Sequence, residues 1–190
     1  MCGIAGIYSP IKSRVMLSNI ATNMADSIFH RGPDDGGIWL DSHTNIAFSH
    51  RRLSIIDTSS FGHQPMISDD DRFVLVFNGE IYNYKELRSE LIKKGFTFRG
   101  MSDTEVLLNL YLSEGKEMLS KLNGIFAFAI LDINLELLFV ARDALGVKPL
   151  YYYSKDNMFA FASEIKSLLR LISNKRELDV ESINRYLSFL

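Results

Sequence analysis

The second residue of the chain, Cys2, is a candidate nucleophile. The sequence opens Met-Cys-Gly-Ile-Ala-Gly-Ile-Tyr, and a small second residue normally permits removal of the initiator methionine. Free thiols have a pKa of about 8.5 and α-amines one of about 8, so the amine of a cysteine that begins a chain can act as base for its own thiol. The sequence therefore predicts an N-terminal nucleophile once Met1 is gone. The alternative is a small apolar residue that starts an edge strand, which is the commoner role of an isolated cysteine.

Asn78 and Gly79 follow an apolar run at 73–77 and allow two interpretations. Asn-Gly is a strong signal for a type I′ hairpin turn. Only three residues separate that turn from a helix start expected at Asn83, which leaves a very short return strand. In the functional interpretation, the Asn78 side-chain amide and the Gly79 backbone N–H bind an oxyanion, as acyl transfer from an amide requires.

Arg52 and Asp103 are candidates for holding the charged groups of an amino acid. A guanidinium can bind a carboxylate through two parallel hydrogen bonds, although a surface ion pair is the commoner role of a single arginine. Asp103 stands at the first position of an expected helix, where an acid favours the helix dipole whatever else it does. Together, the two residues could grip the carboxylate and the ammonium of an amino acid and leave its side chain facing the thiol.

The composition places these residues in an ordinary globular protein. The chain has 190 residues, 47% hydrophobic and 23% charged, with a formal net charge of −2 and no basic stripe that would suggest nucleic acid or an anionic membrane. Cys2 is its only cysteine, which excludes internal disulfides and a multi-cysteine metal site. We expect no metal site, no signal peptide or membrane span, and a cytoplasmic location.

Three segments have the apolar periodicity of helices. The first is a stripe from Leu17 to Ile28, which we expect to end where Gly32 and Pro33 follow. The other two follow capping-box pairs, Asn83 with Glu86 and Ser102 with Glu105.

The expected strands, at 73–77, 125–131, 137–141 and 159–162, are continuous apolar runs, which indicates burial on both faces. Short polar turns at 132–135 and 155–157 join neighbouring runs, so these strands should pair antiparallel. Antiparallel strands are buried on both faces only when two sheets pack together under a cover of helices. We therefore predict an α+β fold, a four-layer α/β/β/α sandwich of two antiparallel sheets.

The motifs of the chain, taken together, resemble the glutaminase domain of glutamine-hydrolysing asparagine synthetases, which are class II amidotransferases. The resemblance runs through nearly the whole chain, and its motifs are MCGIAGIY, HRGPDDGG at 30–37, HRRLSIID at 50–57, GHQPM at 62–66, FNGEIYNYKELR at 77–88, SDTEV at 102–106, LNGIFAFAI at 122–130, RDALGVKPLYY at 142–152 and ASEIKSLL at 162–169. The glucosamine-6-phosphate and phosphoribosylamine-forming amidotransferases share the Cys-Gly start. The proline of HRGPD and the strings RLSIID and NGEIYN favour the asparagine synthetase branch.

The resemblance implies a fold and a set of roles. The family fold is the N-terminal nucleophile hydrolase sandwich. Cys2 would form a γ-glutamyl thioester and release ammonia, and Asn78 and Gly79 would form the oxyanion hole. L-glutamine would be held by its α-carboxylate at Arg52, by backbone groups around Ile55 and Ile56, and by its α-amine at Glu80 and Asp103. We further expect Arg31 with Asp34, and Arg142 with Asp143, to form structural ion pairs near the site.

One feature of the family is missing from this sequence. Members continue into a synthetase domain that uses ATP and Mg²⁺ and whose SGG-x-DS loop holds pyrophosphate, a motif that does not occur here. We expect residues 1–172 to form the glutaminase domain and 173–190 to begin the connection to a synthetase domain supplied in cis or in trans. A helix over 182–190 should then leave Ile183, Tyr186, Leu187 and Leu190 uncovered.

Three functions remain open at this stage. The glutaminase could supply ammonia for asparagine synthesis, it could serve another acceptor such as a sugar acid in a polysaccharide precursor, or the chain could be a silent regulatory module. No cofactor is expected in this domain itself. Self-association into a homodimer also stays open.

Overall fold

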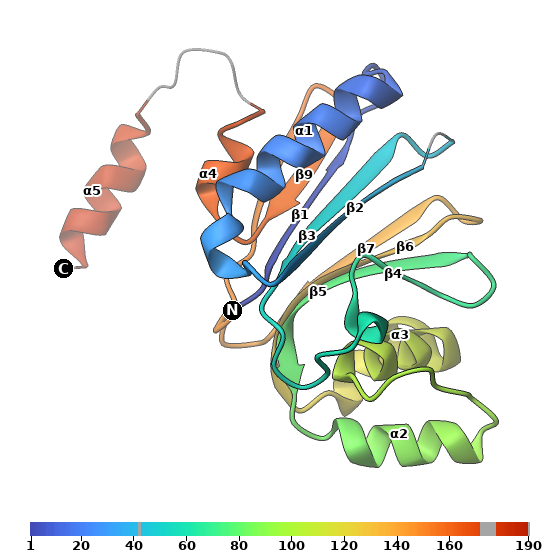
Figure 1. Cartoon of the computed structure of the whole chain (residues 1–190). Coiled ribbons are helices and arrows are strands. Elements are labelled where there is room, and N and C mark those ends of the chain that lie inside the picture. Colours follow the sequence, from blue (N-terminus) through green and yellow to red (C-terminus); the bar gives the residue numbers. More distant parts are fainter. Residues whose placement is uncertain (42, 172–177, 190) are drawn as a thin grey trace.

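Two antiparallel sheets face each other, and helices cover their outer faces (Figure 1). The computed structural model describes residues 1–41, 43–171 and 178–189. The five-stranded sheet has the order β2 (Asp35–Asp41), β3 (Ile46–Arg52), β1 (Gly3–Tyr8), β9 (Met158–Ala162) and β8 (Tyr151–Lys155). The four-stranded sheet has the order β4 (Met66–Ile67), β5 (Phe73–Ile81), β6 (Gly124–Asp132) and β7 (Leu137–Arg142). The predicted α/β/β/α sandwich is confirmed.

The core lies in three layers because side chains alternate along each strand. On β5, Val74 and Val76 join the cluster between the two sheets, whereas Leu75 and Phe77 join the cluster under the helices. The turns predicted at 132–135 and 155–157 connect β6 to β7 and β8 to β9 in antiparallel register. Such a core puts both faces of the central strands out of contact with water.

Helices α1 (Arg14–Ser27) and α4 (Ile165–Leu168) pack on the five-stranded sheet. The predicted stripe of α1 is confirmed, since Leu17, Ala21 and Met24 are buried. The helix ends at Ser27, earlier than expected, because a short 3-10 helix (Phe29–Arg31) carries the chain on to Gly32. Other 3-10 helices occupy Ser60–Gly62 and Gly115–Lys121.

Helices α2 (Tyr84–Lys93) and α3 (Asp103–Glu114) cover the four-stranded sheet. Ser102 caps α3 as predicted, because its hydroxyl accepts a hydrogen bond from the Glu105 N–H. The capping box predicted at Asn83 is wrong. The Asn83 side chain makes no cap bond and instead binds the backbone of the segment before β6, at Lys121 and Asn123.

Three interpretations of the strands need correction. β7 is only half-buried, because it is the last strand of its sheet and lacks a neighbour on one side. Asn78 and Gly79 do not form a hairpin turn, since β5 runs straight through them to Ile81 and pairs with β6 along that length. β1 is a central strand, between β3 and β9, and not an edge strand.

The end of the described chain is a separate helix, α5 (Val180–Ser188), which Figure 1 draws apart from the sandwich. Ile183, Tyr186 and Leu187 are exposed as predicted. Leu190 and the predicted boundary between residues 172 and 173 lie outside the described residues. No helix in the described ranges is both long and apolar enough to cross a membrane.

Candidate active site

Cys2, Arg52 and Asn78 lie at one end of the layer between the sheets. Strand residues two or four positions apart point to the same side. Ile4, Phe48 and Val76 belong to the apolar cluster between the sheets. They lie two, four and two positions from Cys2, Arg52 and Asn78, respectively, and so point to the same side as these residues. The alternation of three strands therefore turns a thiol, a guanidinium and a carboxamide toward one another where the apolar core stops.

A cavity of about 120 Å³ opens at this point. All eight residues that the sequence suggested for the site line it: Cys2, Arg52, Ile55, Ile56, Asn78, Gly79, Glu80 and Asp103. Ile55 and Ile56 stand on the loop after β3 and Glu80 stands near the end of β5, and all three are exposed. The residues singled out from the sequence thus form one site, although they are spread over the first 103 positions.

The Cys2 segment is held in place by its backbone. The Arg31 Nε donates to the Cys2 carbonyl at 2.9 Å, and another guanidinium nitrogen of Arg31 lies 3.0 Å from the Glu164 Oε1. The Cys2 Sγ accepts from the Leu53 N–H at 3.4 Å. Burial alone would raise the pKa of Glu164, but hydrogen bonds led by that from Arg31 lower it to about 2. Glu164 therefore stays charged and fixes the arginine that orients the cysteine.

The edge of β5 explains why donors remain free at the cavity. The Tyr82 N–H donates to the Asn123 carbonyl, which continues the pairing of β5 with β6. Even-numbered residues of β5 therefore direct their N–H and C=O groups to β6, and odd-numbered residues direct theirs to the opposite edge of the strand. At that opposite edge, most odd-numbered residues have a partner. Phe73 binds Ser68, and Leu75 pairs with Met66 of β4. Further along, Phe77 binds His50 and Gln64, and the Ile81 N–H donates to Asp103. Gly79 alone in this series has no partner within the described part of the chain.

Asn78 adds a second free donor beside the Gly79 N–H. The residue is only 1% exposed, and its Nδ2 has no hydrogen-bond partner among the described residues. A buried polar group without a partner costs about 1–3 kcal/mol, so native proteins rarely keep one without a reason. A Cβ on Gly79 would meet the Ile125 carbonyl oxygen at 2.4 Å, so only glycine lets the strand pass there. Two adjacent vacant N–H donors facing a cavity are suited to bind an anionic oxygen.

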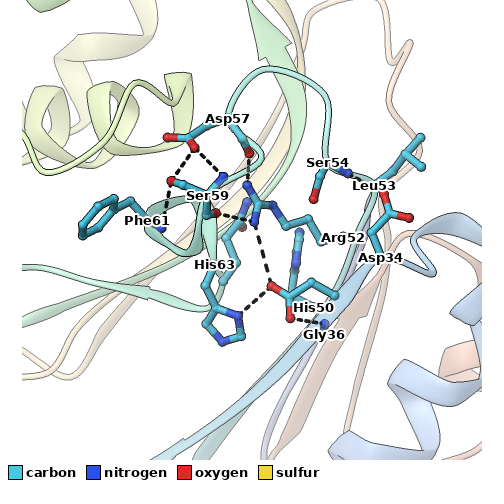
Figure 2. Close-up of polar contacts among 12 residues, drawn as sticks. Asp34, Gly36, His50, Arg52, Leu53, Ser54, Asp57, Ser59, Phe61 and His63 are labelled. Carbon is cyan, nitrogen blue, oxygen red and sulfur yellow. Dashed lines mark hydrogen bonds and ion pairs between the residues drawn. The ribbon is translucent and has the colours of Figure 1, made fainter.

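Arg52 is buried and supports the loop over the cavity (Figure 2). Its guanidinium donates to the backbone carbonyls of Asp57 and Ser59 and lies 4.0 Å from the Asp35 carboxylate. Asp35 in turn binds His63 at 2.8 Å. The interpretation as a simple surface ion pair is therefore wrong, because most contacts of Arg52 are to loop backbone.

Asp103 is the acid buried most deeply in the cavity wall. Burial raises its pKa to about 6, although the hydrogen bond from the Ile81 N–H, 3.0 Å from Oδ2, favours the charged form. Nearby Glu80 raises the pKa further by charge repulsion. A positive ligand group would relieve both effects. No group of three or more metal-ligating side chains occurs in the described ranges.

The family of this chain follows from its similarity to known proteins. The family profile described as "Glutamine amidotransferase domain" matches residues 1–190. The chain belongs to this family. It is 45% identical over 191 residues to "Asparagine synthetase [glutamine-hydrolyzing] 1" of Bacillus subtilis (strain 168), an alignment that covers 100% of this chain and 30% of that protein. It is 38% identical to "Asparagine synthetase B [glutamine-hydrolyzing]" of Escherichia coli (strain K12), over 93% of this chain and 31% of that protein.

A solved structure confirms the fold of the amidotransferase domain. The B. subtilis glutamine phosphoribosylpyrophosphate amidotransferase, complexed with ADP and GMP, superposes with a TM-score of 0.75 over 90% of this chain and 43% of that one. At 24% identity this likeness shows the fold alone. Measured against the asparagine synthetases, this chain spans about a third of their length, and the matched part is their N-terminal glutaminase domain.

Two ion pairs expected near the amidotransferase site do not form. Arg31 pairs with Glu164, while the Asp34 carboxylate accepts from the Ser54 N–H at 2.9 Å. Asp143 binds backbone N–H groups of its own loop and of β6 in place of Arg142. Both carboxylates bind loop backbone, Asp34 through one donor and Asp143 through several, because a carboxylate can accept more than one backbone N–H.

Among the further residues of the cavity wall, sequence reasoning gave no role to four polar or charged ones: Asp57, Gln64, Thr104 and Lys148. All four lie inside motifs that carried the resemblance. The motifs therefore indicated the family, but they did not indicate that these side chains line the site. Gln64 is the clearest case. Its side chain reaches the Phe77 backbone at 2.6 Å, a contact between segments that no local pattern indicates.

Proposed function

We propose that the protein hydrolyses the side-chain amide of L-glutamine to glutamate and ammonia, with Cys2 as nucleophile after removal of Met1. The vacancy of the Asn78 Nδ2 and the Gly79 N–H beside Cys2 carries this proposal. Amide hydrolysis develops negative charge on the carbonyl oxygen, and only a site with preorganised donors stabilises that charge well. Vacant donors also explain why the folded protein tolerates a buried carboxamide without a partner.

In the first half of the reaction, the free α-amine of Cys2 takes the thiol proton, and the thiolate attacks the Cδ of glutamine. The electron pair of the carbonyl moves to its oxygen, which accepts hydrogen bonds from Asn78 and Gly79. The α-ammonium then returns its proton to the departing nitrogen, so ammonia leaves and a γ-glutamyl thioester remains. Nucleophile and base belong to one residue, as in other N-terminal nucleophiles.

In the second half, water replaces ammonia in the same geometry. The α-amine accepts a proton from the water, hydroxide adds to the thioester carbon, and the same two donors hold the new oxyanion. Collapse releases glutamate and restores the Cys2 thiol with the proton from the amine. The cycle consumes glutamine and water and needs no cofactor in this domain.

The other cavity residues would bind the amino-acid end of glutamine. Arg52 would hold the α-carboxylate, with help from backbone groups around Ile55 and Ile56. Asp103 and Glu80 would receive the α-ammonium, which also favours the charged form of Asp103. A cation and two acids in the same cavity would fix the orientation in which the substrate binds.

The ammonia would serve a second active site. We propose a synthetase domain in cis or in trans, with aspartate as acceptor and with ATP and Mg²⁺ in that domain, because the longer relatives are asparagine synthetases. The cytoplasm is the proposed compartment, since a thiol nucleophile needs reducing surroundings. Incubation with the synthetase partner, ATP, Mg²⁺ and aspartate should give asparagine. Ammonia release without amide transfer would point to another acceptor.

Glutamate release tests the proposal. The protein with a free Cys2 amine should hydrolyse glutamine, whereas Cys2→Ala should not. A version that keeps an uncleaved peptide ahead of Cys2 is the matched control for the base, because it retains the thiol but buries the amine in an amide bond. Equal turnover by this version would remove the amine from the mechanism, and equal turnover by Cys2→Ala would overturn the proposal.

A further inference from the structure

His50 is a buried histidine that the reaction described above does not use. It lies on β3, opposite Ile4 of β1, and is 1% exposed. Its Nε2 lies 3.2 Å from the carbonyl oxygen of Phe77, on β5 of the other sheet. The contact therefore joins β3, the neighbour of the strand that follows Cys2, to β5, the strand that carries Asn78 and Gly79.

The protonation state of His50 follows from its surroundings. Burial lowers its pKa to about 3, so the ring is neutral at physiological pH. A neutral imidazole has one N–H, and a carbonyl oxygen can only accept a hydrogen bond. The proton must therefore sit on Nε2 and be donated to Phe77, while Nδ1 has no partner in the described part of the chain.

The Phe77 carbonyl belongs to the same planar peptide unit as the Asn78 N–H. The other side of that unit pairs with Ala127 of β6, so His50 and β6 hold it from opposite sides. The Phe77 N–H is held in turn by Gln64, whose Nε2 reaches the Thr104 hydroxyl at 3.4 Å. β4 stops short of this point, and two side chains replace the missing strand. The peptide ahead of the two vacant donors is thus fixed on every side.

We propose that His50 is a positioning residue for the oxyanion site, acting through the Phe77 carbonyl to aim the Asn78 side chain and the Gly79 N–H at the reacting oxygen. This inference rests on the proposed glutaminase function. It predicts a role confined to the transition state, because His50 does not line the cavity and acts only through the Phe77 carbonyl. A misplacement of about 1 Å at such donors costs up to about 100-fold in rate.

Two substitutions separate the hydrogen bond from general packing. His50→Gln keeps an amide N–H near the position of Nε2, whereas the shorter His50→Asn cannot reach the Phe77 carbonyl. His43→Asn is the matched control, since His43 is an exposed histidine on a turn outside the cavity wall. All three variants and the parent are first compared by thermal unfolding, so that loss of fold is recognised as such.

The decisive experiment measures glutamine hydrolysis together with inhibition by glutamate γ-semialdehyde, an aldehyde that the Cys2 thiol converts to a tetrahedral oxyanion. For His50→Asn we expect kcat to fall by about 10- to 100-fold, an equal loss of affinity for the aldehyde and an unchanged KM. His50→Gln should recover most of both losses. Equal kcat and aldehyde affinity in the parent and His50→Asn would overturn the inference, as would a rise in KM at constant kcat or a failure of His50→Gln to recover activity while folded.

The parent protein distinguishes this inference from the function on which it rests. A parent that does not hydrolyse glutamine contradicts the proposed function. A parent that hydrolyses glutamine and is matched by a folded His50→Asn contradicts the role of His50 alone. Nitrogen-15 NMR of labelled histidine adds a direct check, because the proton should sit on Nε2 of a neutral ring. Protonation of Nδ1 alone would overturn the assignment.

Discussion

The end of β5 and the loop at 143–148 border the same cavity but treat their buried polar groups in opposite ways. In the loop, the Asp143 carboxylate accepts backbone N–H bonds from Phe126 at 3.2 Å, from Val147 at 2.9 Å and from Lys148 at 3.0 Å. Burial alone would raise the pKa of Asp143, but these bonds hold it below its ordinary value. On β5, the Asn78 Nδ2 and the Gly79 N–H have no partner in the described ranges.

The two regions show how a structural carboxylate differs from a site residue. Asp143 is fully engaged by the chain, so it shapes a loop and has little capacity left for a ligand. Asp103 accepts the Ile81 N–H at 3.0 Å and has its pKa raised, so it keeps capacity for a positive ligand. At Asp103 the desolvation that comes with burial outweighs the hydrogen bonds, whereas at Asp143 the backbone hydrogen bonds outweigh it. Four predictions test this contrast.

The largest effect is expected at the vacant donor. Asn78→Ala should lower kcat by roughly 100- to 1,000-fold, the usual loss for one oxyanion donor. Its folded state should be no less stable, since no hydrogen bond within the protein is broken. Kinetics and thermal unfolding of Asn78→Ala are compared with those of Asn109→Ala, on α3, which should keep full activity. A wild-type rate in Asn78→Ala would show that the vacancy has no catalytic meaning.

Asp103→Asn should weaken use of glutamine because the ammonium loses its buried partner. Removing one member of such a pair costs about 2–3 kcal/mol, or about 30- to 150-fold in kcat/KM. The change should fall mainly on KM, because the ammonium lies away from the reacting carbon. Steady-state kinetics beside Asp70→Asn, a substitution in a surface turn, provide the measurement. Unchanged KM in Asp103→Asn would exclude it from substrate binding.

The same isosteric change should alter stability in opposite directions at the two aspartates. Because the folded pKa of Asp103 is about 6, above its ordinary 3.8, its ionisation weakens the fold as the pH rises from 3.8 through 6. Asp103→Asn should therefore raise the free energy of unfolding at pH 7, by at most about 3 kcal/mol.

At Asp143 the pKa is lowered, so its carboxylate stabilises the fold above the unfolded pKa, and that stability is lost as the pH falls through the folded pKa. Asp143→Asn should thus lower the free energy of unfolding at pH 7, on the order of 1–3 kcal/mol. Urea unfolding of both variants measures the pair. Changes of the same sign would refute the contrast between the two sites.

The smallest effect concerns pH. In Cys2→Ala, which binds glutamine without turnover, the affinity should be about tenfold weaker at pH 5 than at pH 7, because Asp103 must first lose its proton. Calorimetric titration at both pH values gives the ratio. The double variant with Asp103→Asn should show a nearly flat dependence, and an equally steep one would assign the ionisation to another group.

Much of this structure could be predicted from sequence because its signals are local. Continuous apolar runs indicated β5 and β6 as strands between two packed layers, and the Ser102 cap placed Asp103 at the start of α3. The site residues came from motifs, and the alternation of strands then explains why they meet. The α1 stripe was likewise visible, since burial on one face imposes a helical period on the sequence.

The remaining features depend on contacts between distant segments. Asn78-Gly79 looks like a turn by composition, but pairing with β6 keeps it extended. Asn83 has the residue type of a helix cap, yet the segment before β6 recruits its side chain. The inter-sheet bond of His50 and the contact of Gln64 with Phe77 arise only once the sheets have packed. Local propensity is a weak guide wherever such tertiary partners compete for the same groups.

The most direct test of the account is the mass of the protein during turnover. Protein with a free Cys2 amine is mixed with glutamine, quenched in acid and analysed intact and after peptide mapping. The account predicts an added mass of one γ-glutamyl group on Cys2, absent from Cys2→Ala and scarce in Asn78→Ala. An adduct on another residue, or glutamate release by Cys2→Ala at the parent rate, would contradict it.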